Sequence, residues 1–550
     1  MGIPFFYTHI IKSHPNILNK FTNSIESEAI NNLYLDCNSI IYDCLRNFTN
    51  VSEEKLIEAT IKRIEEIIEL LVPTSKCLIA FDGVAPLSKL HQQRIRRFKS
   101  SFEKQAKQEL KIPIESNGWD TNTITPGTNF TTVLSKQVQN YFKEKETFSK
   151  IEFIVSACDC KGEGEHKIFS YITNNLKYHS NTTTVVYGLD ADLIMLALIR
   201  ASSCRKLFLY RETPTYIKSI NDSLSDKDHY LLDVKMLKER VNALLTDDPL
   251  DTTDRINDYV FLCFFLGNDF LPHTPSINIR NDGISILIDA YKKTISSMRT
   301  SSIHTPGIQT PSNLVKEKPS TLRLISANGR PVWLVIKKLI FELKTNEHER
   351  IKNEHASRSR FNCKETTISN ERFNFIPLID RRVEEYINPS EHMWQSRYYN
   401  KLFNITGQWG GISRKQVCSD YIKSLDWTLS YYLSGCVDWR WGYHYLYTPL
   451  LDDLYQFIPT LNTVFFNKII DNPVNPQTQL AYVLPKTSYH LLDKKVVQLM
   501  DTNKYRNYHD DISLVWAYCK YFWESKLVFN NDIDINDLEN DIKATLHIKY

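Results

Sequence analysis

The sequence predicts an α/β protein: a mainly parallel sheet flanked by helices, followed by a second, largely helical and aromatic-rich region. Three observations support this prediction. Short apolar runs rich in β-branched residues occur at 33–35, 77–81, 151–155, 184–187 and 207–209. Longer segments of helical periodicity lie between them, and this alternation is typical of a parallel sheet. From near Phe373 the chain contains many aromatic residues, among them Trp394, Tyr398, Tyr399, Trp427, Tyr431, Tyr432, Trp439 and Trp441.

The clearest single element is a helix over residues 53–71. Ser52 is a good N-cap, acids fill the first turn, and Pro73 follows the end. We divide the chain into an N-terminal α/β unit (1–295), a connecting segment that is partly helical and partly flexible (296–372), and a second helical unit (373–550). Ser, Thr and Pro at 300–322 predict a flexible linker. The charged residues at 345–372 predict either a solvated helix or a disordered segment.

The composition excludes several classes of protein. The chain has 550 residues and a net charge of only +3, so any attraction to nucleic acid must come from local clusters. No apolar run approaches the ~18 residues of a membrane span, and the first residues lack the pattern of a signal peptide. The eleven cysteines have no regular spacing, which favours free thiols. We therefore expect a soluble intracellular protein with no membrane partner, cytoplasmic or alternatively nuclear.

Acidic residues follow several predicted elements at the point where each ends. In an open α/β sheet, ligands bind beyond the carboxyl ends of the strands. Carboxylates gathered there repel one another unless protons or cations neutralise them. Oxygen ligands favour Mg²⁺ or Mn²⁺ over zinc, and two such ions can activate water for a phosphoryl displacement. The seven acids at such positions are Asp36, Asp82, Glu163, Glu165, Asp190, Asp192 and Asp269.

Each acid is weak evidence by itself. Roughly nine in ten single Asp residues after a strand are helix caps or turn residues. The Gly-Glu-Gly-Glu segment at 162–165 would alone indicate a solvated loop. The combination in chain order is more specific than any member. Two nearby histidines, His166 and His273, are expected to be structural, because a lone His near a helix start usually makes a capping or core hydrogen bond.

A basic helix is predicted shortly after Asp82. Residues 87–111 contain eight Lys or Arg residues against two Glu. Lys89, Gln93, Arg96 and Arg97 share one helical face, at spacings i, i+4, i+7 and i+8. Arg offers bidentate hydrogen bonds to phosphate oxygens, so this face suits a terminal phosphate. A basic run alone is a solvated surface in roughly two cases of three, but the adjacent acids favour the phosphate site.

These residues and segments together resemble the 5′→3′ exoribonuclease (XRN) family. The matching segments, in family order over the first 291 residues, are MGIPFFYTHI, NLYLDCNSIIYDC, FDGVAPLSKLHQQRIRRF, KGEGEHKIFSYI, YGLDADLIMLAL and LGNDFLPHTPSINIR. Weaker similarity covers WQSRYYNKLF, LDWTLSYYLSGCVDWRWGYHYLYTPLLDDL and NPQTQLAYVLP in the second region. The resemblance implies a PIN-like, 5′-nuclease-like catalytic unit over 1–295. It also implies that the second region wraps this unit and closes its cleft, giving a compact nuclease core.

The resemblance further implies an activity and its site. Family members degrade single-stranded RNA that carries a 5′-monophosphate, releasing mononucleotides with the help of Mg²⁺. By resemblance, the seven acids hold two Mg²⁺ ions, with Mn²⁺ as an alternative. The four residues of the basic face, from Lys89 to Arg97, hold the 5′-phosphate. The decapping machinery is a candidate partner, and we expect a monomer.

The sequence departs from the family pattern at a few positions. Tyr42 stands where the family has a His that stacks on the terminal base, and Tyr can still stack because base–aromatic contact needs only a π-face. The partner Trp from the second region is either Trp439 or Trp441, and the sequence leaves both open. Lys161 replaces a Pro before the acidic tetrapeptide, and Ser39 replaces a Gly. Neither change removes one of the seven acids.

Two other functions remain as alternatives. A flap-type or 5′→3′ DNA nuclease shares the acidic centre, but no helix–hairpin–helix pattern follows Asp269. A non-catalytic RNA-binding scaffold on a nuclease fold would be expected to have lost one of the paired acids, and all seven are present.

Overall fold

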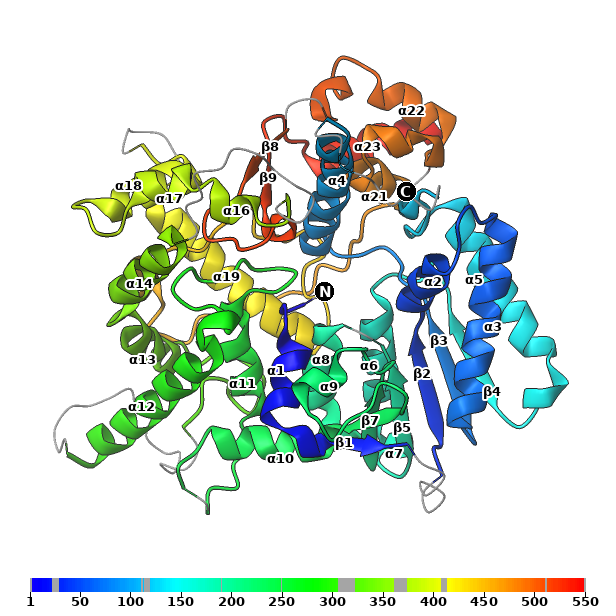
Figure 1. Cartoon of the computed structure of the whole chain (residues 1–550), viewed down its shortest axis with the longest axis horizontal. Helices are drawn as coiled ribbons and strands as arrows, with labels where there is room; N and C mark the ends of the chain where they lie inside the picture. The colour runs from blue at the N-terminus through cyan, green and yellow to red at the C-terminus, as the bar shows by residue number, and fades with distance from the viewer. Residues whose placement is uncertain are drawn as a thin grey trace.

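The structure, a computed structural model, is built on a seven-stranded sheet, which lies at the lower right in Figure 1. The strand order is β1-β7-β6-β5-β2-β3-β4. The residues that the structure describes are 2–21, 29–109, 112, 119–188, 190–248, 250–304, 322–360, 373–406, 413–509 and 512–548.

The five central strands are parallel, as predicted. They are β2 (Asn32–Asp36), β3 (Lys76–Ala80), β4 (Glu152–Ser156), β5 (Thr183–Tyr187) and β6 (Lys206–Tyr210). Two further strands, β7 (Tyr230–Asp233) and β1 (Leu18–Lys20), extend one edge in antiparallel pairing. The sequence analysis missed both, because strands of three or four residues are too short for a periodicity signal.

Alternation along the strands divides the core into two halves, one on each face of the sheet. On one face, Tyr34, Leu78 and Val186 pack with helices α6 (Gly164–Asn174), α8 (Ala191–Arg200), α10 (Val234–Leu244) and α11 (Ile256–Cys263). On the other, Leu33 and Val185 pack with α2 (Cys37–Arg46), α3 (Glu53–Leu71) and α5 (Asn129–Glu144). Successive strand side chains point to opposite faces, so both faces are apolar and both are covered by helices. The predicted α/β class is thereby confirmed.

The helices of the N-terminal unit fit the predicted pattern. The Lys55 amide donates to Ser52 Oγ at 3.3 Å, which confirms the predicted N-cap of α3. The helices are α1 (Phe6–Ser13), α2 (Cys37–Arg46), α3 (Glu53–Leu71), α4 (Leu87–Glu109), α5 (Asn129–Glu144), α6 (Gly164–Asn174), α7 (Leu176–His179), α8 (Ala191–Arg200), α9 (Ile217–Ile220), α10 (Val234–Leu244) and α11 (Ile256–Cys263).

The connecting segment is more regular than its composition predicts. Helix α12 (Gly283–His304) crosses the expected boundary at 295/296 and includes the first residues of the predicted flexible linker, so that expectation was wrong for 300–304. Residues 305–321 lie outside the described part of the chain. Helix α14 (Glu347–Ser359) occupies the charged segment, and Glu347, Ile351 and Arg358 on it are buried. It is therefore a helix, but not a fully solvated one; residues 361–372 lie outside the described part.

The second region is largely helical, as predicted, with one two-stranded sheet of β8 (Ile512–Val515) and β9 (Lys526–Phe529). Its helices and those of the connecting segment, besides α12 and α14, are α13 (Trp333–Lys344), α16 (Ile376–Ile379), α17 (Arg382–Ile387), α18 (Trp394–Phe403), α19 (Arg414–Leu433), α20 (Leu451–Phe457), α21 (Pro476–Val483), α22 (Lys494–Met500) and α23 (Ile535–Leu546). None of the described helices is long and apolar enough to span a bilayer.

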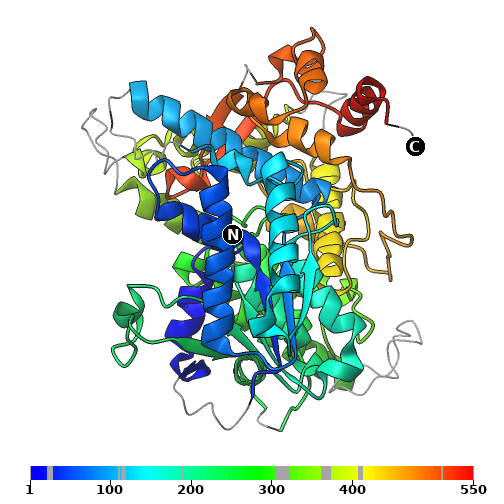
Figure 2. The ribbon, with the colours of Figure 1, turned by 90° about the vertical axis from the view of Figure 1, so that its right-hand side faces the viewer.

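The two regions share their cores instead of meeting at a polar boundary. One apolar cluster joins Ile194 of α8 to Trp333 of α13 and Tyr432 of α19. Another joins Leu87 and Leu90 of α4 to the C-terminal helices α21–α23. Figure 2 shows α4, in light blue, beside the orange C-terminal segment. The second region therefore packs against both α8 and α4 of the N-terminal unit.

Candidate active site

Sheet topology brings the predicted acids to one edge. Asp36 is the last residue of β2, Asp82 follows β3, and Asp190 precedes α8 just beyond β5. Because β2, β3 and β5 are parallel neighbours, their carboxyl ends meet at the same edge. Glu163 and Glu165 begin α6 at that edge.

Hydrogen bonds and close approach hold the acids in place. The Gly164 amide donates to Asp82 Oδ1 at 2.7 Å, and Asn38 Nδ2 donates to Asp82 Oδ2 at 2.7 Å. A Cβ on Gly164 would lie 2.5 Å from Asp36 Oδ1, so a side chain at this position would displace that carboxylate. Asp269 is held by the N-terminal segment, because its Oδ1 accepts from the Gly2 amide at 3.2 Å. The small residues between the acids are thus required by the geometry.

Burial and mutual repulsion raise the pKa of several of these carboxyls. Burial is the largest cause for Asp36, followed by the negative charges of Asp82 and Asp190, and its pKa lies well above the usual range. Burial and then Asp192 raise the pKa of Glu165 in the same direction. Burial and then Asp269 raise the pKa of Asp192 to about 7. Each of the seven acids is close enough to another for one charge to affect the pKa of the other, so all seven form one cluster. Asp190 is its exposed member.

The donor set fits hard divalent cations. Asp36 Oδ1 and Glu165 Oε2 are shielded from solvent and accept no hydrogen bond from the described residues. Ligand atoms of Glu163, Glu165 and His166 lie within 4.8 Å of one another. Two buried carboxylate oxygens without donors are costly unless a cation or a proton occupies the space before them. Carboxylate-rich sites of this kind suit Mg²⁺ or Mn²⁺.

Lys89 of α4 lies among the acids. Its Nζ donates to Asp269 Oδ2 at 2.7 Å and forms an ion pair with Glu163. Burial lowers the pKa of Lys89, but Asp269 and Glu163 outweigh burial and leave it well above the usual range. The ammonium group is therefore charged, and it stands between the acid cluster and the rest of the basic face.

The other three members of the basic face differ in burial. Gln93 and Arg97 are buried and bonded to each other, with Arg97 Nη1 3.3 Å from Gln93 Oε1 and Nη2 2.9 Å from Thr125 Oγ1. Burial acts to raise the pKa of Asp269, but Lys89 and, to a smaller extent, the exposed Arg96 of α4 lower it. Lys89, Gln93 and Arg97 thus line one strip of α4 beside the acids, while Arg96 borders it. Their role in phosphate binding stays a prediction.

The three predicted stacking residues lie in different surroundings. Tyr42 on α2 is partly buried and close enough to Arg97 to affect its pKa. Trp439 is bonded through its carbonyl to the Leu87 amide at 3.0 Å, and Lys161 Nζ lies 5.6 Å from its ring centre. Trp441 instead donates to Ser424 Oγ at 3.1 Å and packs on Phe466, within the second region. Trp439 is therefore the one of the two that borders the N-terminal unit at the start of α4.

Two tyrosines of α19 complete the cluster, and the sequence analysis did not assign them a role. Tyr431 Oη donates to Glu163 Oε2 and Tyr432 Oη to Asp192 Oδ1, both at 2.8 Å. The His166 ring packs on Tyr431 with centroids 3.8 Å apart, and burial lowers its pKa to about 4. The adjacent Tyr-Tyr pair was visible in the sequence, but nothing local could show that it would reach acids 268 and 240 residues away in the chain.

Two protein-family models match the chain. Residues 1–213 match the family model described as XRN 5′-3′ exonuclease N-terminus. Residues 249–391 and 344–528 match that of the Xrn1 helical domain. The chain is 26% identical to 5′-3′ exoribonuclease 1 of Schizosaccharomyces pombe, over 90% of this chain and 44% of that protein. It is 25% identical to 5′-3′ exoribonuclease 2 of Debaryomyces hansenii (91% and 65%) and 27% to that of Gallus gallus (95% and 68%).

Two solved structures are more distantly similar. The catalytic core of Rad2 in complex with DNA has a TM-score of 0.31 at 12% identity, covering 58% of this chain and 77% of that one. The T5 D15 protein co-crystallised with metal ions has a TM-score of 0.24 at 10% identity, covering 58% and 92%.

Proposed function

Because the chain belongs to the XRN family of 5′-3′ exonucleases, we propose that it is a 5′→3′ exoribonuclease. Its substrate is single-stranded RNA with a 5′-monophosphate, and its products are 5′-mononucleotides. The observation that carries this proposal is the convergence of seven carboxylates beside a strip of α4 that begins with Lys89.

The acid cluster would hold two Mg²⁺ ions, with Mn²⁺ as an alternative. When bound, such ions supply an activated water and stabilise charge on the leaving oxygen. Asp36 and Glu165 each offer an oxygen without a donor, whereas Asp82 accepts two hydrogen bonds from the protein and Asp192 accepts one from Tyr432. These hydrogen bonds orient the carboxylates before a cation arrives, so the site is preorganised.

The strip of α4 would position the chain end. Arg97 and Gln93 are fixed by their mutual hydrogen bond, and a buried guanidinium offers paired donors to phosphate oxygens. Tyr42 would stack on the first base, and Trp439, whose carbonyl accepts from the Leu87 amide at the start of α4, would be its counterpart. A 5′-hydroxyl end would leave the Arg97 charge without a partner, which is the physical basis for selecting a phosphate end.

We extend the proposal to the cellular setting expected from the sequence. The enzyme acts as a monomer in the cytoplasm, with the nucleus as the alternative, on 5′-phosphate ends such as those that a decapping reaction leaves. The curated relatives are named 5′-3′ exoribonucleases, and the chain spans 44% of the first of them and 65% of the second.

The test is hydrolysis of end-labelled RNA. The purified chain is incubated with Mg²⁺ and with EDTA, on one RNA that ends in 5′-phosphate and on the same RNA ending in 5′-hydroxyl. We expect mononucleotides only from the phosphorylated RNA and only with Mg²⁺. Asp190→Asn should abolish release, while Asp501→Asn, at an exposed acid beyond α22, should not. Equal decay of the two RNAs would refute the phosphate site, and full activity of Asp190→Asn would refute the metal assignment.

A further inference from the structure

Three aromatic side chains form an exposed group beside α4, which we call the aromatic platform: Phe5, Tyr521 and Trp523. The rings of Tyr521 and Trp523 are nearly parallel, with an interplanar angle of 11° and centroids 5.9 Å apart. Phe5 lies against both, at 6.4 and 6.5 Å. Phe5 is 45% exposed and Trp523 is 42% exposed. Large aromatic surface left in water is unfavourable, and grouped exposure of this kind marks a binding surface more often than chance.

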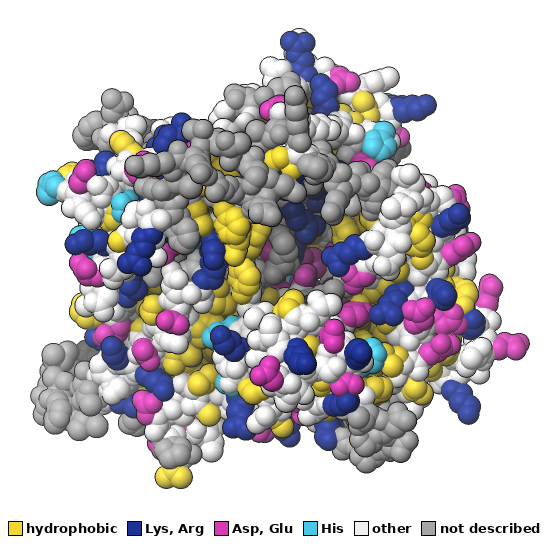
Figure 3. Space-filling model, viewed as in Figure 1, with side chains coloured by type: hydrophobic (Ala, Val, Ile, Leu, Met, Phe, Trp, Pro, Cys, Tyr) yellow, Lys and Arg dark blue, Asp and Glu magenta, His cyan; other side chains and the backbone are white. Residues whose placement is uncertain are grey.

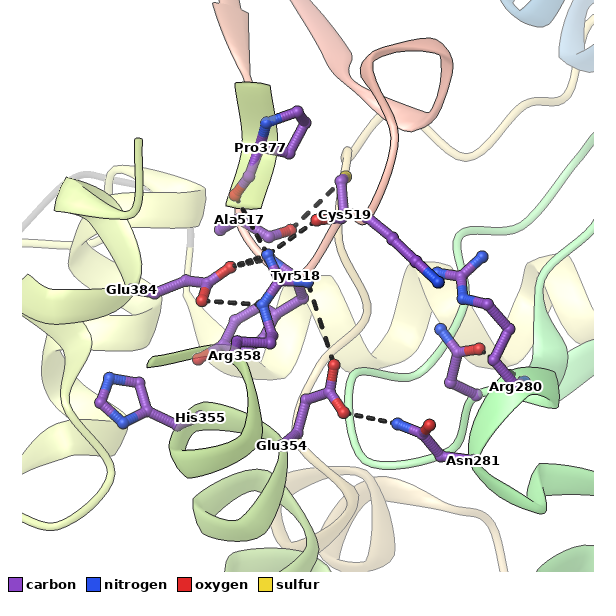
Figure 4. A network of polar contacts seen from close by, with 12 residues as sticks. Arg280, Asn281, Glu354, His355, Arg358, Pro377, Glu384, Ala517, Tyr518 and Cys519 are labelled. Atoms are coloured by element: carbon purple, nitrogen blue, oxygen red, sulfur yellow. Dashed lines mark hydrogen bonds and ion pairs between the residues drawn. The ribbon is translucent and has the colours of Figure 1, made fainter. Parts of the chain in front are cut away.

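Buried ion pairs hold the segment before the platform rigidly. Figure 4 shows Arg358 between Glu384 and the 517–519 segment. Arg358 donates to Glu384 Oε1 at 2.6 Å and to the Cys519 carbonyl at 2.7 Å. The Tyr518 amide donates to the same Glu384 oxygen at 2.7 Å. All four residues are buried, so these bonds are shielded from water and fix the backbone that leads into the platform.

A second set of bonds fixes the platform from its other side. Glu524 Oε2 accepts from the Lys520 amide at 2.6 Å and from the Tyr521 amide at 3.1 Å. Arg280, from the N-terminal unit, donates to Glu524 Oε1 at 2.6 Å. The aromatic rings are therefore exposed because the surrounding structure holds them there, not because the segment is loose. A rigid, exposed ring loses little entropy when a ligand stacks on it.

Positive charges surround the rings. The Arg280 guanidinium is 5.8 Å from the ring centres of both Phe5 and Tyr521, and Lys520 Nζ is 5.2 Å from that of Tyr521. Lys99 of α4 donates to the Ser525 carbonyl at 2.7 Å. Glu524 pairs with Arg280 and the two charges offset each other, so the excess positive charge beside the rings comes from Lys520 and Lys99. Aromatic rings edged by cations match the bases and phosphates of a single-stranded nucleic acid.

A cavity connects the platform to the acid cluster. It has a volume of about 740 Å³, and its lining includes Trp523 of the platform, Lys526, Arg96 of α4, and Asp269 of the acid cluster with its neighbour Gly2. In Figure 3, apolar side chains, in yellow, border the central hollow on its left, over the region of α16. An RNA chain whose end lies at the acids can therefore continue through this cavity to the platform.

We propose that the aromatic platform is an outer binding site for the RNA strand, where bases several nucleotides from the cleaved end stack on Trp523, Tyr521 and Phe5. This inference rests on the proposed function, because it takes the cleaved end to lie at the acids. The committed ligand is the single-stranded RNA substrate. Its bases would contact the rings, and its phosphates would lie near Arg280 and Lys520. The platform would thereby keep a long RNA attached between successive cuts.

The experiment compares short and long RNA on the full chain. Dissociation constants are measured by fluorescence anisotropy in the hydrolysis-deficient Asp190→Asn background with Mg²⁺, using 5′-phosphorylated RNAs of about 4 and about 16 nucleotides. Trp523→Ala should weaken binding of the long RNA by about 10- to 100-fold, the range for loss of one stacked base. Binding of the short RNA should change less than about twofold, and Trp523→Phe should retain most of the affinity. The matched control is Tyr386→Ala, which removes an aromatic ring of similar exposure on α17.

Each other outcome overturns the inference. Unchanged binding of long RNA by Trp523→Ala would mean that the platform serves another partner, such as a protein. Weakened binding of a free mononucleotide without an effect on long RNA would make it a product site. Equal weakening of short and long RNA would indicate damage to the active site or to folding, which thermal unfolding of the variant would reveal. Failure of the proposed function is distinguishable, because in that case the otherwise unaltered chain releases no mononucleotides whatever the state of the platform.

Discussion

Replacing Asp192 by Asn in metal-free protein is the sharpest test of the electrostatics of the acid cluster. Asp192 is buried, and burial followed by the charge of Asp269 raises its pKa from 3.8 to about 7. Its folded-state pKa is thus above its unfolded value. The stability contributed by the protonated group is present below pH 3.8 and is lost as the pH rises through 7.

The size of the effect follows from the same two values. At about 1.4 kcal/mol for each pKa unit, the interval from 3.8 to about 7 corresponds to roughly 4 kcal/mol. At pH 8 and without metal, Asp192→Asn should therefore be more stable than the unaltered chain by up to about 4 kcal/mol. At pH 4 the two should be nearly equal. The Asn side chain keeps an oxygen that can accept from Tyr432 Oη, so the comparison isolates the charge.

The measurement is urea unfolding of both proteins in EDTA at several pH values, repeated with excess Mg²⁺. With Mg²⁺ the order at pH 8 should reverse or vanish, because a bound cation stabilises the folded ionised form. A constant difference between the two proteins from pH 4 to 8 in EDTA would show that Asp192 ionises normally. The proposed crowding of carboxylates would then be refuted.

Two further predictions follow from other residues. Arg97→Ala should reduce the preference for 5′-phosphate over 5′-hydroxyl RNA by about 10- to 100-fold, as expected for a charge-assisted hydrogen bond of about 1.5–3 kcal/mol; comparative rates on the two RNAs measure it, and an unchanged preference would exclude Arg97 from the phosphate site. Burial, followed by His444, lowers the pKa of His91 to about 3, so its contribution to stability is present above pH 6.5 and is lost as the pH falls towards 3. When the pH is lowered from 7 to 5, the free energy of unfolding of His91→Phe, measured by urea unfolding, should therefore fall by about 2 kcal/mol less than that of the unaltered chain. An equal fall in both proteins would contradict the low pKa of His91.

Much of the N-terminal unit could be predicted because its signals are local. Each central strand is a short apolar run, and the Ser52 cap and Pro73 delimit α3 within one stretch of sequence. The acids could be predicted because parallel strands bring their carboxyl ends to one edge of the sheet, so residues that follow the strands meet there. The short edge strands β1 and β7 gave no such signal, because only their pairing with β6 and with each other makes them strands.

Local composition was misleading where burial decided the outcome. The charged segment that became α14 buries Glu347 and Arg358 within ion pairs and hydrogen bonds to distant segments. The polar composition of this segment predicted exposure to solvent, because composition does not show which residue will pair with a charged side chain. The choice between Trp439 and Trp441 was open for the same reason, since both lie in one tripeptide and differ only in what packs against them.

The sequence by itself determined the five central strands, the alternation of strands and helices, the acids that follow them and the family resemblance, because these depend on neighbours along the chain. The tertiary structure alone decided that Tyr431 and Tyr432 reach the acids, that Lys89 lies among them, and that Phe5 meets Tyr521 and Trp523 beside α4. Such contacts join residues hundreds of positions apart, and the packing of the second region against α4 and α8 brings them together.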